Sequence, residues 1–373
     1  MNEHQVLIIG GGLAGLTAAI HLVMEGLDVA VFEQQTYPHH KVCGEYVSKE
    51  ITPYLEQLGI DLKSVGAVDI NQFQISNVEG YAVHTDLPLG GWGISRYAFD
   101  QLLYHRAKAL GVRFYFEKVK QVDYQNDLFT IFANNSTYTS KVVLGAYGKR
   151  SILDKKMERD FSMKKQAWLA VKMHYRYPEF PEHLVGLHNF EGGYAGLSKT
   201  ESGAVNFCYL AHYPSFKKYR DIEVFNNEVA AQNPFLRTFL SVARPIFDQP
   251  MTIAQISFDK KDAVVNHVLM CGDTAGLIHP LCGNGMAMAI HSAKIASELV
   301  LRFLQNENYS RLNLEKDYRK AWVKTFGKRL WFGRKLQGIL LNKSLVSVGI
   351  RSIGKSSRLL KYIISRTHGK LIS

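Results

Sequence analysis

Three glycines near the start of the chain constrain its fold more than any other feature. Gly10, Gly12 and Gly15 are spaced as G-x-G-x-x-G in "LIIGGGLAGLTAAI" (7–20), between an apolar run and a helix-forming stretch. The first glycine permits a tight turn, the second lets the backbone approach a pyrophosphate, and the third lets the helix pack closely on the strand. The sequence therefore predicts a β-α-β unit whose helix N-terminus holds the phosphates of a dinucleotide.

A carboxylate ends the second strand of this unit, and a second glycine-rich loop lies late in the chain. Glu33 closes "DVAVFE" (28–33), where it is placed to accept hydrogen bonds from ribose hydroxyls of either NAD or FAD. In residues 272–298, Gly272-Asp273 follows an apolar strand and Gly283-Asn284-Gly285 opens a helix. A protein that binds only NAD has no use for this second loop, whereas FAD uses one loop for its ADP half and another for the ribitol and isoalloxazine. We therefore expect FAD.

These segments resemble the p-hydroxybenzoate-hydroxylase-type flavoproteins, which include monooxygenases, flavin-dependent halogenases and geranylgeranyl reductases. Four ordered motifs carry the resemblance over most of residues 1–310: the glycine loop with Glu33, "KVCGE" (41–45), "SRYAFDQLLYHRAKALG" (95–111) and the loop at 272–285. The resemblance implies that Arg96 lies near the FAD pyrophosphate, that Asp273 binds a ribitol hydroxyl, and that residues 283–286 present N–H groups to the flavin. The residues expected to bind FAD are Gly10, Gly12, Leu13, Ala14, Gly15, Glu33, Gln34, Lys41, Cys43, Gly44, Arg96, Val119, Gly145, Ala146, Tyr147, Gly148, Gly272, Asp273, Pro280, Gly283, Asn284, Gly285 and Met286.

The chain departs from the family patterns at positions that bear on the reaction. Tyr147 in "GAYGKRS" (145–151) replaces the aspartate of the monooxygenases' Gly-Ala-Asp-Gly, which puts a nicotinamide-docking role for this loop in doubt. The halogenases' Trp-x-Trp-x-Ile-Pro is absent, and the reductases' Tyr-x-Trp-x-Phe-Pro is half kept in "YAGLS" (194–198). These motifs leave the branch of the family open.

Residues 165–258 are rich in aromatic and β-branched residues, which is typical of an antiparallel sheet. We expect an α/β fold in which a Rossmann-like FAD-binding domain is interwoven with a mostly antiparallel β substrate lobe, followed by a basic helical C-terminal segment. The predicted ranges are 1–66, 95–164 and 259–317 for the FAD-binding domain, 67–94 and 165–258 for the lobe, and 318–373 for the C-terminal segment.

Few protein acids or bases are expected, because the cofactor carries the chemistry. Cys43 and Cys282 fall in loops expected at the flavin, and His279 precedes Pro280 there; each is a candidate proton donor, with simple packing as the alternative. The candidate substrate contacts are Tyr175, His188, Tyr194 and Tyr209, with core packing as the alternative. We expect NAD(P)H-driven monooxygenation of a hydrophobic phenolic or isoprenoid molecule. The alternatives are reduction of C=C bonds in a prenyl or polyene lipid, and a non-catalytic flavin- or lipid-binding role.

The positive charge of the chain is concentrated at its C-terminal end. The net charge is +12, yet residues 318–373 contain 14 Lys and Arg and no acidic residue. Apolar residues recur at helical spacing in 329–341 and 357–366, which indicates either a helix docked on an anionic membrane or helices packed on the FAD-binding domain.

Aromatic and basic residues are segregated, so no nucleic-acid partner is expected. Four scattered cysteines predict no metal site and a cytoplasmic protein, peripheral to the membrane if the tail docks there.

Overall fold

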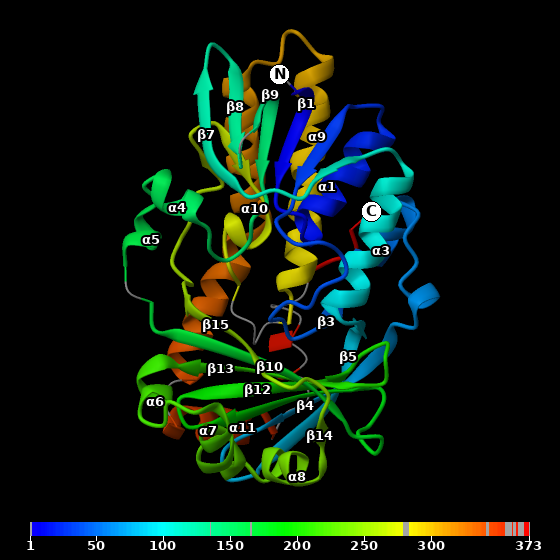
Figure 1. Cartoon of the computed structure of the whole chain (residues 1–373). Coiled ribbons are helices and arrows are strands. Elements are labelled where there is room, and N and C mark those ends of the chain that lie inside the picture. Colours follow the sequence, from blue (N-terminus) through cyan, green and yellow to red (C-terminus); the bar gives the residue numbers. More distant parts are fainter. Residues whose placement is uncertain are drawn as a thin grey trace.

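The computed structural model describes residues 2–134, 136–164, 166–278, 283–340, 343–354, 360, 363–364 and 369–372, and arranges their strands in two sheets. Figure 1 shows one sheet at each end of the molecule, with the chain crossing between them several times. This interwoven α/β fold, with a helical C-terminal segment, is the predicted one.

The first sheet contains the glycine-loop unit. Its strand order is β16-β17-β9-β1-β2-β6, and β1 (Asn2–Ile9) pairs in parallel with both β2 (Val29–Phe32) and β9 (Ser136–Gly145). The second half of β1 is an apolar run because a central parallel strand is buried on both faces. The remaining strands are β6 (Arg113–Tyr115), β7 (Val119–Gln125), β8 (Leu128–Ala133), β16 (Val264–Val265) and β17 (Val268–Met270).

The second sheet forms the lobe and is antiparallel except for the pair β4–β11. Its order is β14-β10-β13-β12-β11-β4-β5-β3, and β15 also pairs with β10. The strands are β3 (Tyr46–Ser48), β4 (Val68–Ser76), β5 (Ala82–Gly93), β10 (Trp168–Arg176), β11 (Leu184–Phe190), β12 (Gly193–Lys199), β13 (Val205–His212), β14 (Arg244–Pro245) and β15 (Met251–Ile256). β3 falls in the range predicted for the FAD-binding domain, yet it pairs with β5 of the lobe.

Helices pack on both sheets. α1 (Leu13–Met24) contacts β1 and β2 and also packs against α3 (Arg96–Ala109) and α9 (Gly285–Gln305). The other helices and short 3-10 turns are η1 (Lys49–Ile51), α2 (Thr52–Gln57), η2 (Lys63–Val65), α4 (Ile152–Lys156), α5 (Asp160–Met163), α6 (Tyr213–Lys217), α7 (Ile222–Glu228), η3 (Ala230–Gln232), α8 (Pro234–Val242), η4 (Gly272–Thr274), α10 (Arg311–Leu340) and α11 (Lys343–Gly354). The outer face of the lobe sheet packs on α7 and α8 through a cluster of aromatic side chains.

The C-terminal segment begins as part of the core. Tyr318, Trp322 and Phe326 recur every four residues on α10 and are buried, and α10 packs against α9. The predicted segment 329–341 lies largely in this longer helix, whereas 357–366 falls mostly outside the described residues. Among the helices described, none is long and apolar enough to cross a bilayer.

Candidate FAD and substrate site

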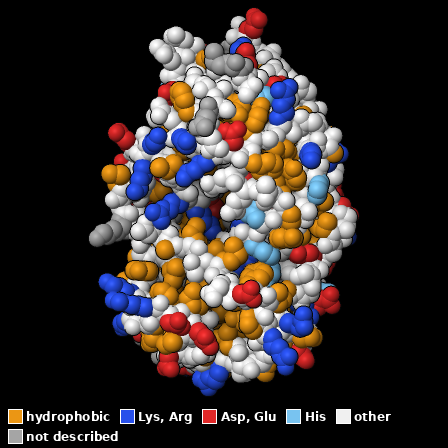
Figure 2. Space-filling view, viewed as in Figure 1, with side chains coloured by type: hydrophobic (Ala, Val, Ile, Leu, Met, Phe, Trp, Pro, Cys, Tyr) orange, Lys and Arg blue, Asp and Glu red, His pale blue; other side chains and the backbone are white. Residues whose placement is uncertain are grey.

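A cleft lies between the two sheets and has two connected parts. The polar chamber, of about 770 Å³, is lined by the glycine loop and Glu33, and the apolar chamber, of about 260 Å³, lies between the flavin-side loops and the lobe sheet. Gly12, Arg96 and Asp273 line both chambers, so the two form one continuous cleft. Figure 2 shows the hollow on this face of the molecule, with Lys and Arg side chains gathered along one side of it.

Two cations converge on the glycine loop. A Cβ atom placed on Gly12 would lie 3.4 Å from Arg96 Nη2 and 3.8 Å from Lys41 Nζ. Asp100 is fully buried beneath them and accepts hydrogen bonds from Arg96 Nε (2.6 Å) and Nη2 (2.7 Å), with Lys41 Nζ at 3.0 Å. Burial favours the neutral acid, but the charges of Arg96 and Lys41 outweigh it and lower the pKa of Asp100. Lys41 Nζ also lies 3.9 Å from Glu33 Oε2, so the two cations are balanced by two carboxylates. Both cations still place N–H donors beside the glycine loop, where a pyrophosphate would accept them.

Glu33 organises the adenosine end of the polar chamber. Its Oε2 accepts the Gly11 N–H (3.0 Å), and its Oε1 accepts the backbone N–H groups of Gln34 (2.8 Å) and Gln35 (3.2 Å). These bonds hold the carboxylate at the carboxyl end of β2, beside the glycine loop, which is where the ribose of a dinucleotide binds in folds of this kind. Gln34 and Val119 line the same chamber.

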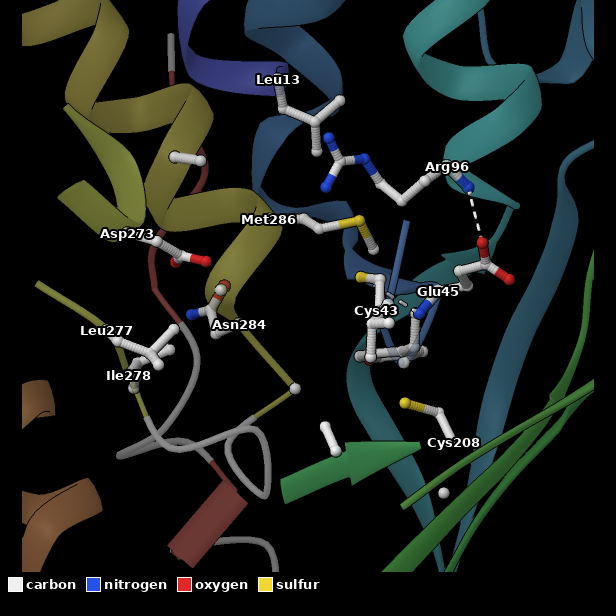
Figure 3. A pocket seen from close by; sticks show the side chains of 18 of the residues that line it. Leu13, Cys43, Glu45, Arg96, Cys208, Asp273, Leu277, Ile278, Asn284 and Met286 are labelled. Carbon is white, nitrogen blue, oxygen red and sulfur yellow. Dashed lines mark hydrogen bonds between the residues drawn. The ribbon is translucent and has the colours of Figure 1, made fainter. Parts of the chain in front are cut away.

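The loop after β17 is tied to the loop after β9. Gly148 N–H donates to Thr274 Oγ1 (2.8 Å), and Arg159 Nη2 donates to the Thr274 carbonyl (2.8 Å). Asp273 therefore has a fixed position at the junction of the two chambers, and Figure 3 shows its carboxylate pointing into the cavity. α9 begins next to it at Gly285, so the N–H groups of its first turn supply partial positive charge at the flavin end.

The described residues that were predicted to bind FAD line the cleft, except for two glycines that lie below its surface. Gly15 and Gly145 lie beneath the cleft, where an added Cβ would come within 1.9 Å of the Gly10 carbonyl oxygen and 2.6 Å of Met270 Sδ, respectively. Pro280, His279 and Cys282 lie outside the described residues. The cradle at Gly12, the paired cations and the helix N-terminus fit the phosphates, ribose and flavin edge of FAD.

Tyr147, at the position of the monooxygenases' aspartate, is held by a buried ion pair. Its hydroxyl donates to Asp154 Oδ1 (3.2 Å) and accepts from Arg159 Nη1 (3.3 Å), and these two side chains pair at 2.8 Å. Burial, followed by the charge of Asp154, raises the pKa of Tyr147, so the residue is neutral at physiological pH. This loop therefore offers a neutral hydroxyl in place of a carboxylate.

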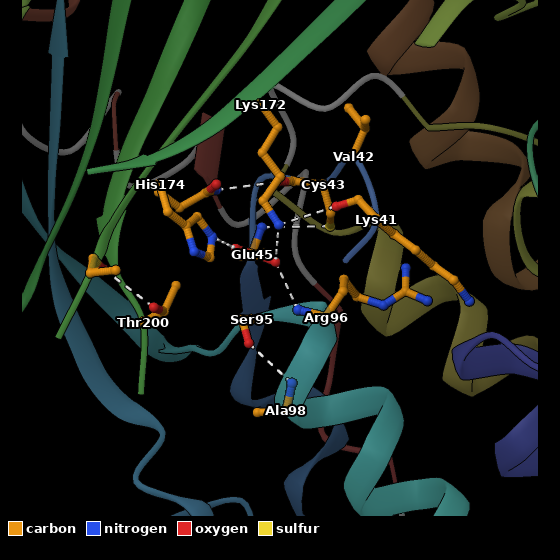
Figure 4. Close-up of polar contacts among 12 residues, drawn as sticks. Lys41, Val42, Cys43, Glu45, Ser95, Arg96, Ala98, Lys172, His174 and Thr200 are labelled. Atoms are coloured by element: carbon orange, nitrogen blue, oxygen red, sulfur yellow. Dashed lines mark hydrogen bonds and ion pairs between the residues drawn. The ribbon is translucent and has the colours of Figure 1, made fainter. Parts of the chain in front are cut away.

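A buried ion cluster connects the cleft to the lobe sheet (Figure 4). Glu45 has no exposed surface; its Oε1 accepts from Lys172 Nζ (2.5 Å) and from the Arg96 backbone N–H (2.7 Å), and its Oε2 lies 2.6 Å from His174 Nε2. Burial raises the pKa of Glu45, but the hydrogen bond to His174 and the charge of Lys172 more than offset this and lower it. The backbone of Glu45 adopts φ +54°, a left-handed conformation that few non-glycine residues take, and the cluster holds it there.

Three residues in and beside this cluster are close enough together to be considered as metal ligands. The ligand atoms of His40, Glu45 and His174 lie within 4.8 Å of one another. Both carboxylate oxygens of Glu45, however, already take hydrogen bonds, and the Lys172 ammonium lies where a cation would be repelled. The geometry favours an ion-pair cluster at this position.

The apolar chamber continues from the flavin-side loops onto the face of the lobe sheet. Phe73, Leu87, Val185 and Leu187 form its far wall, and Tyr194 lies beside them. Cys43 lines the chamber on the opposite side, and Figure 3 shows its sulfur facing Met286 at the start of α9. The Cys43 Sγ accepts the Glu45 N–H at 3.5 Å.

The other predicted substrate contacts lie mainly on the outer face of the sheet. Side chains alternate between the faces of a strand, so Tyr175 and Tyr209 point into the aromatic core that includes Phe207 and Phe239. His188 stacks on Phe235 and bonds to Ser76 Oγ at 2.8 Å. Tyr209 still contributes to the lining of the apolar chamber, while Tyr175 and His188 do not.

The sequence does not single out Glu45 and Cys208, which line the apolar chamber, nor Lys172 and His174, which pair with Glu45 behind it. Contacts between residue 45 and residues 172 and 174 depend on long-range strand pairing, which leaves no local pattern. One signal is present, because Lys172 and His174 are charged or polar residues inside the apolar strand "AWLAVKMHYRY" (167–177), whereas Arg176 stands at its end. A lone lysine in such a strand has to be paired when the strand is buried.

Comparisons with known proteins agree with this geometry. The profile of the FAD binding domain family matches residues 3–319. A digeranylgeranylglycerophospholipid reductase of Methanosarcina acetivorans is 25% identical over 351 residues, covering 87% of this chain and 81% of the relative. Among solved structures, the flavin-dependent brominase Bmp2 has a TM-score of 0.82 at 16% identity, covering 98% of this chain and 93% of its own. A geranylgeranyl bacteriochlorophyll reductase-like protein of Thermoplasma acidophilum has a TM-score of 0.79 at 19% identity, covering 98% and 97%.

The chain belongs to the FAD binding domain family, which makes it a protein of the FAD-dependent oxidoreductase type. Its relatives include reductases and halogenases, which is the superfamily that the sequence motifs indicated.

Proposed function

We propose that the protein reduces carbon–carbon double bonds of an apolar isoprenoid lipid. The observation that carries this proposal is the apolar chamber, which joins the flavin end of the cleft to a wall of Phe73, Leu87, Val185 and Leu187 with the Cys43 thiol facing it. FAD, when bound and once reduced by two electrons from the nicotinamide donor proposed below, would supply the hydride for one alkene carbon. Cys43 supplies the proton for the other carbon and regains it from solvent, so the product gains two hydrogen atoms.

Two further observations favour reduction over the monooxygenation expected from sequence. Tyr147 stands where the monooxygenase pattern has a carboxylate, and its neutral hydroxyl is engaged by Asp154 and Arg159. The Methanosarcina acetivorans relative, which aligns over most of both chains, is named as a reductase of a digeranylgeranyl lipid. Monooxygenation of a phenolic or isoprenoid molecule is the competing outcome of the tests.

NAD(P)H is the proposed electron donor. Lys149, Arg150 and Lys155 line the polar chamber, where their charges suit the phosphates of a second nucleotide. Mixing the oxidised protein with NADH or NADPH without oxygen should bleach the flavin absorbance with one of the two donors.

The proposed reaction is tested by mass spectrometry of the product. Protein with reductant and geranylgeraniol, kept free of oxygen, should yield species heavier by two hydrogens for each bond reduced. Cys43→Ala should slow product formation by about 10²-fold, in the range of a lost general acid, and keep its FAD. Cys208→Ala serves as the matched control, because it removes another thiol that lines the same chamber. Equal rates for both variants would contradict the role of Cys43.

We also propose that the C-terminal segment docks on an anionic membrane surface, from which a lipid enters the cleft. α10 packs on the body, but Trp331, Leu345 and Val348 are exposed by 57%, 52% and 63%. Leu345 and Val348 lie three residues apart on α11, followed by the exposed Arg351. Apolar side chains with neighbouring cations are typical of an interfacial helix, and each cation near the surface contributes about 1 kcal/mol.

A further inference from the structure

Two residues in the middle of the lobe sheet are partly exposed on the side that faces the cleft. β12 and β13 are buried along their length except at Gly196, at Cys208 and at their final residues. Gly196 and Cys208 are direct partners across these strands, and both line the apolar chamber. Their partial exposure in mid-sheet therefore comes from the chamber above them.

The neighbours of this pair define a row across the sheet. Lys172 lies opposite Cys208 on β10, and Leu187 lies opposite Gly196 on β11. One end of the row is polar, because Lys172 is paired with Glu45, and the other end is apolar. Gly196 lies between the two ends, directly beneath the space that a substrate would occupy.

The backbone at Gly196 does not require glycine. A Cβ built there would contact only the Cys208 carbonyl oxygen, at 3.7 Å, which is an ordinary van der Waals distance. In the same sheet, a Cβ at Gly193 would lie 2.3 Å from the Leu210 carbonyl oxygen, and one at Gly186 would lie 2.6 Å from His188 Nε2. Close neighbours therefore require glycine at positions 193 and 186. At position 196 no neighbour requires it, and the effect of the glycine is to leave space in the chamber.

We propose that Gly196 determines which substrates enter, by leaving room in the chamber floor for a bulky apolar group such as a methyl-branched isoprenoid unit. The missing side chain gives the chamber its depth between Cys208 and Leu187, and any larger residue fills that depth. This inference rests on the proposed reaction for the choice of substrate, but the space itself belongs to the unliganded protein.

The test measures ligand binding, which needs no catalytic turnover, in variants with side chains of increasing size at position 196. The FAD-containing protein and the variants Gly196→Ala, Gly196→Val and Gly196→Leu are titrated with cis-parinaric acid, a polyene fatty acid that fluoresces in apolar cavities. Affinity should fall with side-chain volume, by about ten-fold or more for leucine, since even one methylene of mismatch in an apolar pocket changes discrimination by about 10–200-fold. FAD content and thermal midpoint should stay at their wild-type values.

Lys199→Leu is the matched control. Lys199 lies on the same strand, but its side chain points to the other face and bonds to the Pro178 carbonyl (3.0 Å). This variant should bind cis-parinaric acid like the wild type. Equal affinity across the Gly196 series, with FAD and fold retained, would overturn the proposal. Failure to reduce any prenyl lipid would overturn the proposed reaction and leave this binding series unchanged, so the two failures are distinguishable.

Discussion

The Arg96 guanidinium lies 3.4 Å from the point where a Cβ atom would stand on Gly12. Gly12 has no left-handed φ, and nothing in its surroundings prevents a side chain in the free protein. A side chain there would instead fill the space between the loop and Arg96 that a pyrophosphate needs. The glycine is thus required by the cofactor and not by the fold.

Gly12→Val should therefore yield a folded protein without flavin. Far-ultraviolet circular dichroism should match the wild type, while the flavin absorbance per chain should fall to background. Gly15→Val should behave differently, because its Cβ would lie 1.9 Å from the Gly10 carbonyl oxygen and the fold itself should fail. Gly349→Ala is the neutral control, with no atom within 4 Å of the added Cβ. Full flavin in Gly12→Val would contradict the placement of the phosphates.

The buried pair Glu45–Lys172 gives a second prediction. Glu45→Gln leaves the Lys172 ammonium buried without its carboxylate, and Lys172→Met leaves Glu45 with His174 as its remaining side-chain partner. Each variant should therefore lower the free energy of unfolding by about 3–5 kcal/mol. The double variant should recover part of this loss, because no unpaired charge remains. Urea denaturation of all four proteins forms the double-mutant cycle. Additive losses would show that the two charges do not interact.

The glycine loop, Glu33 and the Gly-Asp loop could be predicted from sequence because each depends on local spacing along a β-α-β pattern. The strand order of the second sheet could not, because β4 pairs with β11 across more than a hundred residues of chain. The cluster around Glu45 has the same origin, since strand pairing places Lys172 and His174 beside residues of the "KVCGE" segment. Which residues face the cleft depends on strand register, and a shift of one residue exchanges the two faces.

Acid stability should depend on His188. Asn233 Nδ2 donates to Ser76 Oγ (2.9 Å), and the Ser76 hydroxyl lies 2.8 Å from His188 Nδ1, where it can donate to the neutral ring. Burial, with a smaller contribution from His84, lowers the pKa of His188 to about 3. The unfolded chain binds the extra proton below about pH 6.5, so stability should fall as the pH drops from 6.5 towards 3.

The measurement is the urea midpoint between pH 7 and pH 4. His188→Gln keeps an acceptor for Ser76 and removes the titrating ring, so its midpoint should change less with pH than that of the wild type. Identical pH dependence in the two proteins would assign the acid sensitivity to other groups.

Docking on a membrane should depend on the exposed face of α11. Leu345→Glu with Val348→Glu should reduce co-sedimentation with vesicles of anionic phospholipid, and binding of the wild type should weaken at high salt, where charges are screened. Leu128→Glu is the control, because Leu128 is also exposed but lies in the β7–β8 hairpin at the opposite end of the molecule (Figure 1). Equal binding to neutral and anionic vesicles, or no binding to either, would contradict docking and indicate that the C-terminal segment only packs on the rest of the protein.

A single turnover without oxygen tests the central claim most directly. The protein-bound flavin is reduced photochemically, and geranylgeraniol is then added while the flavin spectrum is followed. The oxidised spectrum should return and the lipid should gain two hydrogens, at a rate lowered by Gly196→Leu and by Cys43→Ala. A flavin that stays reduced until air is admitted, with a product that carries an added oxygen atom, would contradict the reductase and establish the monooxygenase.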